Sequence, residues 1–168
     1  MKPKRKDYTI FVRNFTFGVE DSLVSTVGLL AGIAVANMDR PQIIVTGFVL
    51  IFVEAFSMAV GSLLSEQSVE EYQVQRQVSL SKPINAALIM FFSYVFSGLI
   101  PLAPYFYLSG TAAITTSIVL TLLSLFLLGV VNAKLFRAKV WRDGLFTLLM
   151  GGIAVGVGVV VGQIAGHF

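Results

Sequence analysis

The stretch FGVEDSLVSTVGLLAG, residues 17–32, joins two adjacent carboxylates, Glu20 and Asp21, to a long apolar run. The run extends over residues 16–36, which matches the roughly 20 helical residues needed to cross the hydrocarbon core of a bilayer. Lipid solvates charge poorly, so carboxylates at the opening of a membrane segment are energetically unfavourable and their presence requires an explanation. Whether this stretch is a membrane segment depends on whether the rest of the chain has the composition of a membrane protein.

The composition of the whole chain favours a membrane protein. Of its 168 residues, 56% are apolar and 12% are charged, whereas soluble domains carry about 25% charged residues. A soluble core of helices this apolar would leave almost no polar surface for water. We therefore predict an all-α polytopic membrane protein that forms one transmembrane domain over residues 1–168. Five stretches are each long enough to span the bilayer: 16–36, 43–64, 84–107, 111–132 and 144–166.

The distribution of Lys and Arg predicts the orientation in the membrane. Basic residues gather before the first span and between the fourth and fifth spans, and cytoplasmic segments carry this excess. We expect a cytoplasmic amino terminus and a carboxyl terminus on the opposite side, with no cleaved signal peptide. The net charge of +3 then reports orientation, and no nucleic-acid partner is expected. The residues concerned are Lys2, Lys4, Arg5, Lys6, Arg13, Lys134, Arg137, Lys139 and Arg142.

Two features interrupt the pattern of plain spans. Residues 65–82 are polar and lack Gly and Pro before Pro83, so we expect span two to continue as a cytoplasmic helical extension that stops before Ser81. Span three contains Pro101 and Pro104, which remove helical hydrogen bonds and predict a helix kink.

Few ionisable or polarizable groups lie at membrane depth, and they predict a metal site. Glu54 lies mid-span, and Met58 follows on the same helical face. A carboxylate at this depth is by default a functional-site hypothesis. Carboxylate oxygen suits hard cations and a thioether suits softer ones. Asp21, Glu54 and Met58 together therefore favour a borderline divalent metal, Fe²⁺ or Mn²⁺.

Each candidate also has a purely structural interpretation. Glu54 could be a hydrogen-bonded carboxyl that joins helices, Asp21 a helix N-cap, and Met58 a packing residue. Glu20 points about 100° away from Asp21, and we favour a structural role for it. Glu66 and Glu70 on the extension are either a cytoplasmic metal-capture site or a solvated helix face.

Small residues suggest close helix packing. Gly28 and Gly32 form a GxxxG pattern, which predicts packing of the first span against its symmetry mate in a homodimer. Span five repeats glycine at a spacing of four in Gly158 and Gly162.

Four segments resemble the vacuolar iron transporter family. They are FGVEDSLVSTVGLLAGIA in span one, AFSMAVGSLLSEQS in span two, GLIPLAPY in span three, and LFLLGVVNAKLFRAKVWRDGLFTLLMGGIAVGVGVVVG across spans four and five. The resemblance implies a homodimer with the path at the subunit interface, lined by spans one and two. It also implies export of Fe²⁺ from the cytosol in exchange for protons, with Asp21 and Met58 contacting the metal.

The chain departs from the family pattern at three positions. Ser22 and Glu54 stand where the family usually has Gly, and Ser62 stands where it often has Glu. The segment between spans two and three is also too short for the Glu-rich metal-binding domain that many members carry.

Antiport would need carboxylates that exchange metal for protons, and Asp21 and Glu54 are the candidates for this coupling. The metal is a substrate, and no cofactor is expected. The alternatives are an acidic-pore cation or proton channel, an Mn²⁺-selective exporter, or a membrane scaffold. The absence of cysteine, the single histidine and the lack of catalytic motifs argue against an enzyme.

Overall fold

The computed structural model describes residues 3–136 and 140–166, and within them the chain is entirely helical apart from short links. The helices are α1 Pro3–Val35, α2 Arg40–Val74, α3 Ser81–Leu102, α4 Pro104–Tyr107, α5 Gly110–Phe136 and α6 Val140–Ala165.

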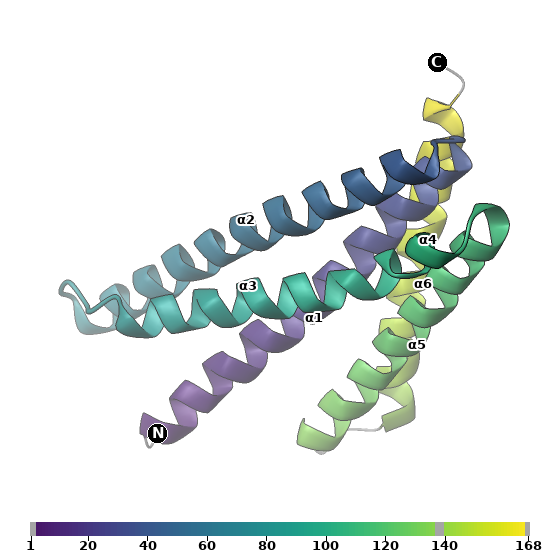
Figure 1. Ribbon diagram of the computed structural model, residues 1–168. Helices are drawn as coiled ribbons and strands as arrows, with labels where there is room; N and C mark the ends of the chain where they lie inside the picture. The colour runs from purple at the N-terminus through teal and green to yellow at the C-terminus, as the bar shows by residue number, and fades with distance from the viewer. Residues whose placement is uncertain (1–2, 137–139, 167–168) are drawn as a thin grey trace.

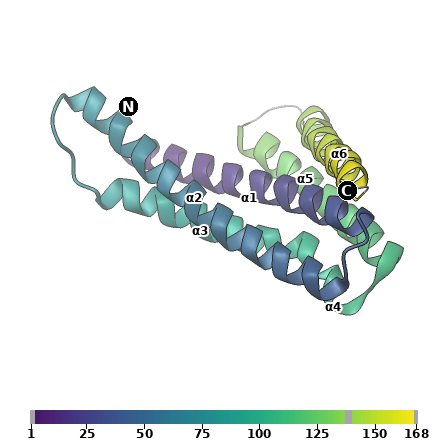
Figure 2. The ribbon, with the colours of Figure 1, turned by 90° about the horizontal axis from the view of Figure 1, so that it is seen from above.

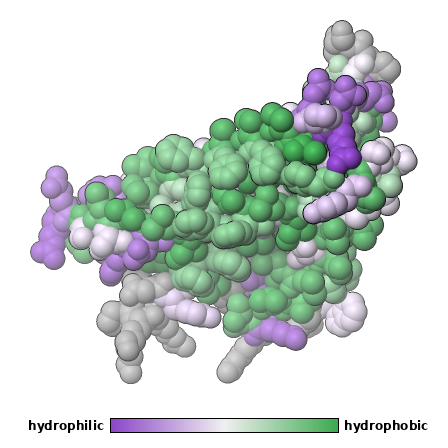
Figure 3. Space-filling model, in the orientation of Figure 1, coloured by the Kyte–Doolittle hydropathy of each residue, from purple (hydrophilic) through white to green (hydrophobic). Residues whose placement is uncertain are grey.

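Five of these helices are long and apolar enough to cross a membrane, and they confirm the predicted fold class. The candidate spans are Tyr8–Val35, Arg40–Val74, Ser81–Leu102, Gly110–Leu135 and Gly144–Ala165. Apolar side chains cover the body of the molecule between more polar ends (Figure 3), and many large ones on α2, α5 and α6 are exposed. This is the surface expected where lipid replaces water. The protein is an integral, multi-pass membrane protein.

Helix α1 is the centre of the bundle. It packs against α3 and α6, while α2 packs mainly on α3 and α5 on α6 (Figures 1 and 2). We call the end that holds the start of α1, the link 75–80, the end of α5 and the start of α6 the amino end. The carboxyl end holds the turn 36–39, α4 and the end of α6.

Helix α2 continues past the predicted second span but ends earlier than expected. It is unbroken from Arg40 to Val74 and stops because Gln75 adopts a left-handed backbone conformation, φ 53°. The Gln75 backbone N–H donates to the Glu71 carbonyl at 2.8 Å and its side chain to the Tyr72 carbonyl. These bonds satisfy the last turn, so residues 75–80 form a link rather than more helix.

The two prolines divide the third span from a short fourth helix. Helix α3 ends at Leu102, one residue after Pro101, and α4 begins at Pro104. The Ser117 hydroxyl of α5 donates to the Pro101 carbonyl at 2.6 Å, and the Arg40 guanidinium donates to the Tyr105 carbonyl at 2.7 Å. Neighbouring side chains thus satisfy carbonyls at the helix break, as a membrane interior requires.

Replacing Ser117 by Ala is expected to lower stability by about 1 kcal/mol, because the Pro101 carbonyl then loses a buried donor. Thermal unfolding of the purified protein in detergent would measure the change. Ser124→Ala is the matched control, since the Ser124 hydroxyl is exposed and donates only within its own helix, to Leu120. Equal losses in the two variants would contradict a role for Ser117 at the break.

Glycines allow α1 and α6 to approach backbone to backbone. A Cβ atom on Gly158 would collide with the Gly28 carbonyl, and one on Gly162 would collide with the Gly32 carbonyl. We predicted that Gly28 and Gly32 would meet a symmetry mate. The structure differs, because the face that they open is occupied by α6 of the same chain.

Candidate functional site

Asp21 and Glu54 lie at the same depth in the bundle. Helices α1 and α2 run antiparallel on either side of the turn 36–39, with Asp21 about 14 residues before the end of α1 and Glu54 about 14 residues after the start of α2. Both positions are therefore roughly 21 Å of helix from the turn. The two half-buried carboxylates lie close enough to interact electrostatically.

The position of Asp21 excludes one structural interpretation. Because α1 begins at Pro3 and its candidate span at Tyr8, Asp21 lies near the middle of the helix rather than at its opening. Asp21 is therefore not an N-cap.

A tyrosine that was not predicted from the sequence lies close to the two carboxylates. Tyr94 of α3 is fully buried, and its hydroxyl shares a 2.7 Å hydrogen bond with the Ser25 hydroxyl. The Ser22 hydroxyl donates to the Tyr94 carbonyl at 2.7 Å. Tyr94 also lies within electrostatic range of both Asp21 and Glu54. The sequence signal was a tyrosine in the middle of an apolar span, together with two serines spaced three apart on α1.

A cavity of about 620 Å³ lies between α1, α2 and α3, on the amino-end side of the carboxylates; we call it the vestibule. Met58, one helical turn from Glu54, contributes to its wall together with Met90 of α3. The Ser62 hydroxyl donates to the Asn14 side-chain carbonyl at 2.6 Å. The lining residues are Arg13, Asn14, Phe17, Ser57, Met58, Gly61, Ser62, Ser65 and Met90.

The two glutamates of the predicted extension each have a basic partner. Glu66 is buried and paired with Arg13 of α1, and the Glu70 carboxylate lies 3.9 Å from the Lys82 ammonium of α3. The solvated-face interpretation is therefore wrong for Glu66. Paired in this way, Glu66 and Glu70 do not present a free acidic pair to metal.

Three side chains of the kinds that ligate metals lie in this part of the chain. Asp21 and Glu54 offer carboxylate oxygens at one level, and Met58 offers a thioether one turn away. Among residues 3–136 and 140–166 no three His, Cys, Asp or Glu side chains gather closely enough to hold a metal ion. The carboxylates would need further ligands from water or from a second copy of the chain.

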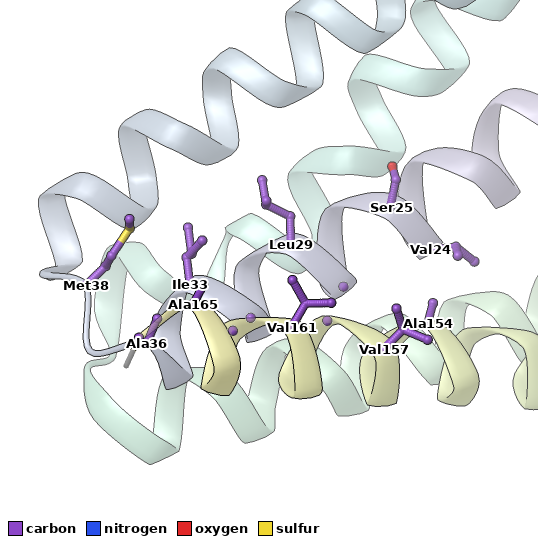
Figure 4. Close-up of a pocket in the computed structure, with 15 residues that line it drawn as sticks. Val24, Ser25, Leu29, Ile33, Ala36, Met38, Ala154, Val157, Val161 and Ala165 are labelled. Carbon is purple, nitrogen blue, oxygen red and sulfur yellow. The ribbon is translucent and has the colours of Figure 1, made fainter. Parts of the chain in front are cut away.

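A second cavity, of about 640 Å³, is apolar. It is a groove between α1 and α6 that runs from Ser25 towards Met38 (Figure 4). Its walls are small and aliphatic side chains, and no carboxylate lines it. The groove therefore lacks the ligands that a divalent metal would require.

Comparison with known proteins places these features in a family. The model of the VIT family matches residues 12–79 and 68–163. The chain is similar to vacuolar iron transporter homolog 5 of Oryza sativa subsp. japonica, with 28% identity over 88% of this chain and 76% of that protein. It is also similar to vacuolar iron transporter homolog 1 of Arabidopsis thaliana, with 27% identity over 88% of this chain and 79% of that protein.

The match covers three of the candidate spans completely and most of the first and the fifth, and it includes Asp21, Glu54 and Met58. The sequence resemblance noted from the four segments is thereby confirmed. This chain belongs to the VIT family.

Proposed function

We propose that this protein is a transporter that exports a divalent transition metal from the cytosol. The observation that carries the proposal is the pair Asp21 and Glu54, two interacting carboxylates near the middle of adjacent spans. Burying such a pair in a bilayer costs several kcal/mol, and this cost favours a functional role for the two carboxylates. The vestibule beside it supplies thioethers from Met58 and Met90, which favour Fe²⁺ over harder cations. The names of the relatives agree with iron as the cargo.

We further propose that the working unit is a homodimer. Asp21 and Glu54 are only half buried in one chain, and α2 exposes large apolar residues beside them. A charged group facing lipid at mid-depth is unfavourable. A second copy packed on this side would cover the carboxylates and add its own, which completes the coordination shell.

The direction of metal transport is proposed from the distribution of basic residues, and its driving force from the chemistry of the two carboxylates. Basic residues at the amino end favour a cytoplasmic amino terminus, so the vestibule faces the cytosol. A divalent metal that binds Asp21 and Glu54 displaces their protons, and protons that return release the metal. We propose antiport of metal against protons by this exchange.

Reconstituted protein tests this proposal. The proteoliposomes have an acidic lumen, so that protons leave the lumen as metal enters it. Fe²⁺ uptake is expected to be saturable and to stop when an ionophore collapses the pH gradient. Mn²⁺ is expected to be a poorer substrate, because a thioether contributes less to a harder ion. Flux that ignores the gradient and does not saturate would favour the cation-channel alternative, and tighter transport of Mn²⁺ would favour the Mn²⁺ exporter.

A further inference from the structure

A permanent positive charge stands in the wall of the vestibule. Arg13 lines this cavity, two helical turns from Asp21 towards the amino end. Arginine stays protonated in proteins, so it repels any cation that enters. Such a residue is unexpected beside Met58 and the two mid-span carboxylates.

Glu66 compensates this charge, and the two side chains of the ion pair differ in their exposure to solvent. The Glu66 side chain is 10% exposed, whereas that of Arg13 is 58% exposed. Glu66 is therefore held in place by α2, and Arg13 is a long side chain able to leave for water. The fixed partner is the anion and the movable partner is the cation.

Other potential ligand atoms line the vestibule, whose wall includes Arg13. Ser62 lies one turn from Glu66 on α2 and lines the vestibule, where its hydroxyl contacts the side chain of Asn14. The thioethers of Met58 and Met90 face the same cavity. Oxygen and sulfur atoms thus line the cavity that Arg13 borders, and the buried carboxylate of Glu66 pairs with the guanidinium of Arg13.

We propose that Glu66 is an entry site for a divalent metal cation and that Arg13 is a tethered competitor that occupies it when metal is absent. An incoming cation takes the place of the guanidinium at Glu66, and Arg13 returns once the cation moves on towards Asp21 and Glu54. The identity of the cation rests on the proposed function. The competition itself rests on the ion pair and the vestibule.

Substitutions of the two partners should shift apparent metal affinity in opposite directions. Arg13→Gln removes the competitor and is expected to lower the metal concentration for half-maximal binding and flux by roughly three- to tenfold. Glu66→Gln removes the ligand and leaves the positive charge, and is expected to raise it by at least as much. The measurements are Mn²⁺ binding to the detergent-solubilised full chain by calorimetry, and Fe²⁺ flux in proteoliposomes.

The controls separate competition from simple structural support. The Arg13→Gln/Glu66→Gln double variant has no unpaired charge and should fold, and its affinity should be weaker than that of Arg13→Gln alone. Lys82→Gln alters the other ion pair, outside the vestibule, and should leave metal affinity unchanged.

Weaker binding in both single variants, or no change in Arg13→Gln, would overturn the competition and leave a structural ion pair. If the wild type binds Mn²⁺ and the two variants shift its affinity in opposite directions, but no metal is transported, the proposed function fails and the entry site stands.

Discussion

Asp21→Asn is expected to reduce metal transport by roughly 10- to 100-fold, which corresponds to the loss of one charge-assisted ligand worth about 1.5–3 kcal/mol. Asn keeps the shape of Asp21 but has no charge for the cation and no proton to exchange. Asp21 interacts with Glu54, and the neighbouring carboxylate of Glu20 points about 100° away around α1 and does not replace it. Initial rates of Fe²⁺ uptake into proteoliposomes, with matched protein content, would measure the effect.

Glu20→Gln is the matched control for this substitution. It removes a carboxylate from the neighbouring residue on α1, which points about 100° away around the helix. Its effect on uptake is expected to be within about threefold, because Glu20 interacts with Asp21 only through its charge. Comparable losses in the two variants would show that total negative charge matters rather than the position of Asp21.

Glu54→Gln distinguishes the two interpretations of Glu54. If Glu54 binds metal, uptake falls as in Asp21→Asn while the thermal stability of the protein is retained. If Glu54 is a structural carboxyl, uptake per folded protein is retained and thermal stability falls.

Gly158→Val is expected to destabilise the protein by about 3 kcal/mol or more, the upper range for overpacked interiors. The new side chain would meet the Gly28 carbonyl of α1, and a helix backbone cannot move aside as a flexible side chain can. The helices would separate along the seam that Gly32 and Gly162 continue. Thermal unfolding in detergent and recovery of monodisperse protein would report the loss.

The same helix provides a control for this substitution. Apart from the neighbouring backbone of α6 itself, no atom of residues 3–136 and 140–166 lies within 4 Å of the position that a Cβ would take at Gly152 or Gly156. Gly156→Val therefore adds the same side chain without a collision and is expected to change stability by less than about 1 kcal/mol. A large loss in Gly156→Val would mean that α6 has a contact on its outer face, as a dimer interface through α6 would require.

The candidate site was only partly predictable. Glu54 and Met58 follow from depth and helical spacing within one element, and the sequence supplies both. Tyr94 did not follow, because its contact with Ser25 joins positions 69 residues apart and no local pattern encodes such a pair. The partner of Glu66 was missed for the same reason, since Arg13 is on another helix.

The sequence by itself determined the all-α class and the number of spans, because a bilayer requires long apolar segments whose backbones satisfy their own hydrogen bonds. Only the tertiary structure decided where α1 begins, that Asp21 lies mid-span, and that Gly28 and Gly32 pack on α6. These features depend on which helix faces which. A polar residue such as Arg13 or Asn14 ends an apolar run in the sequence, whereas in the structure both lie inside α1 and contact side chains of α2.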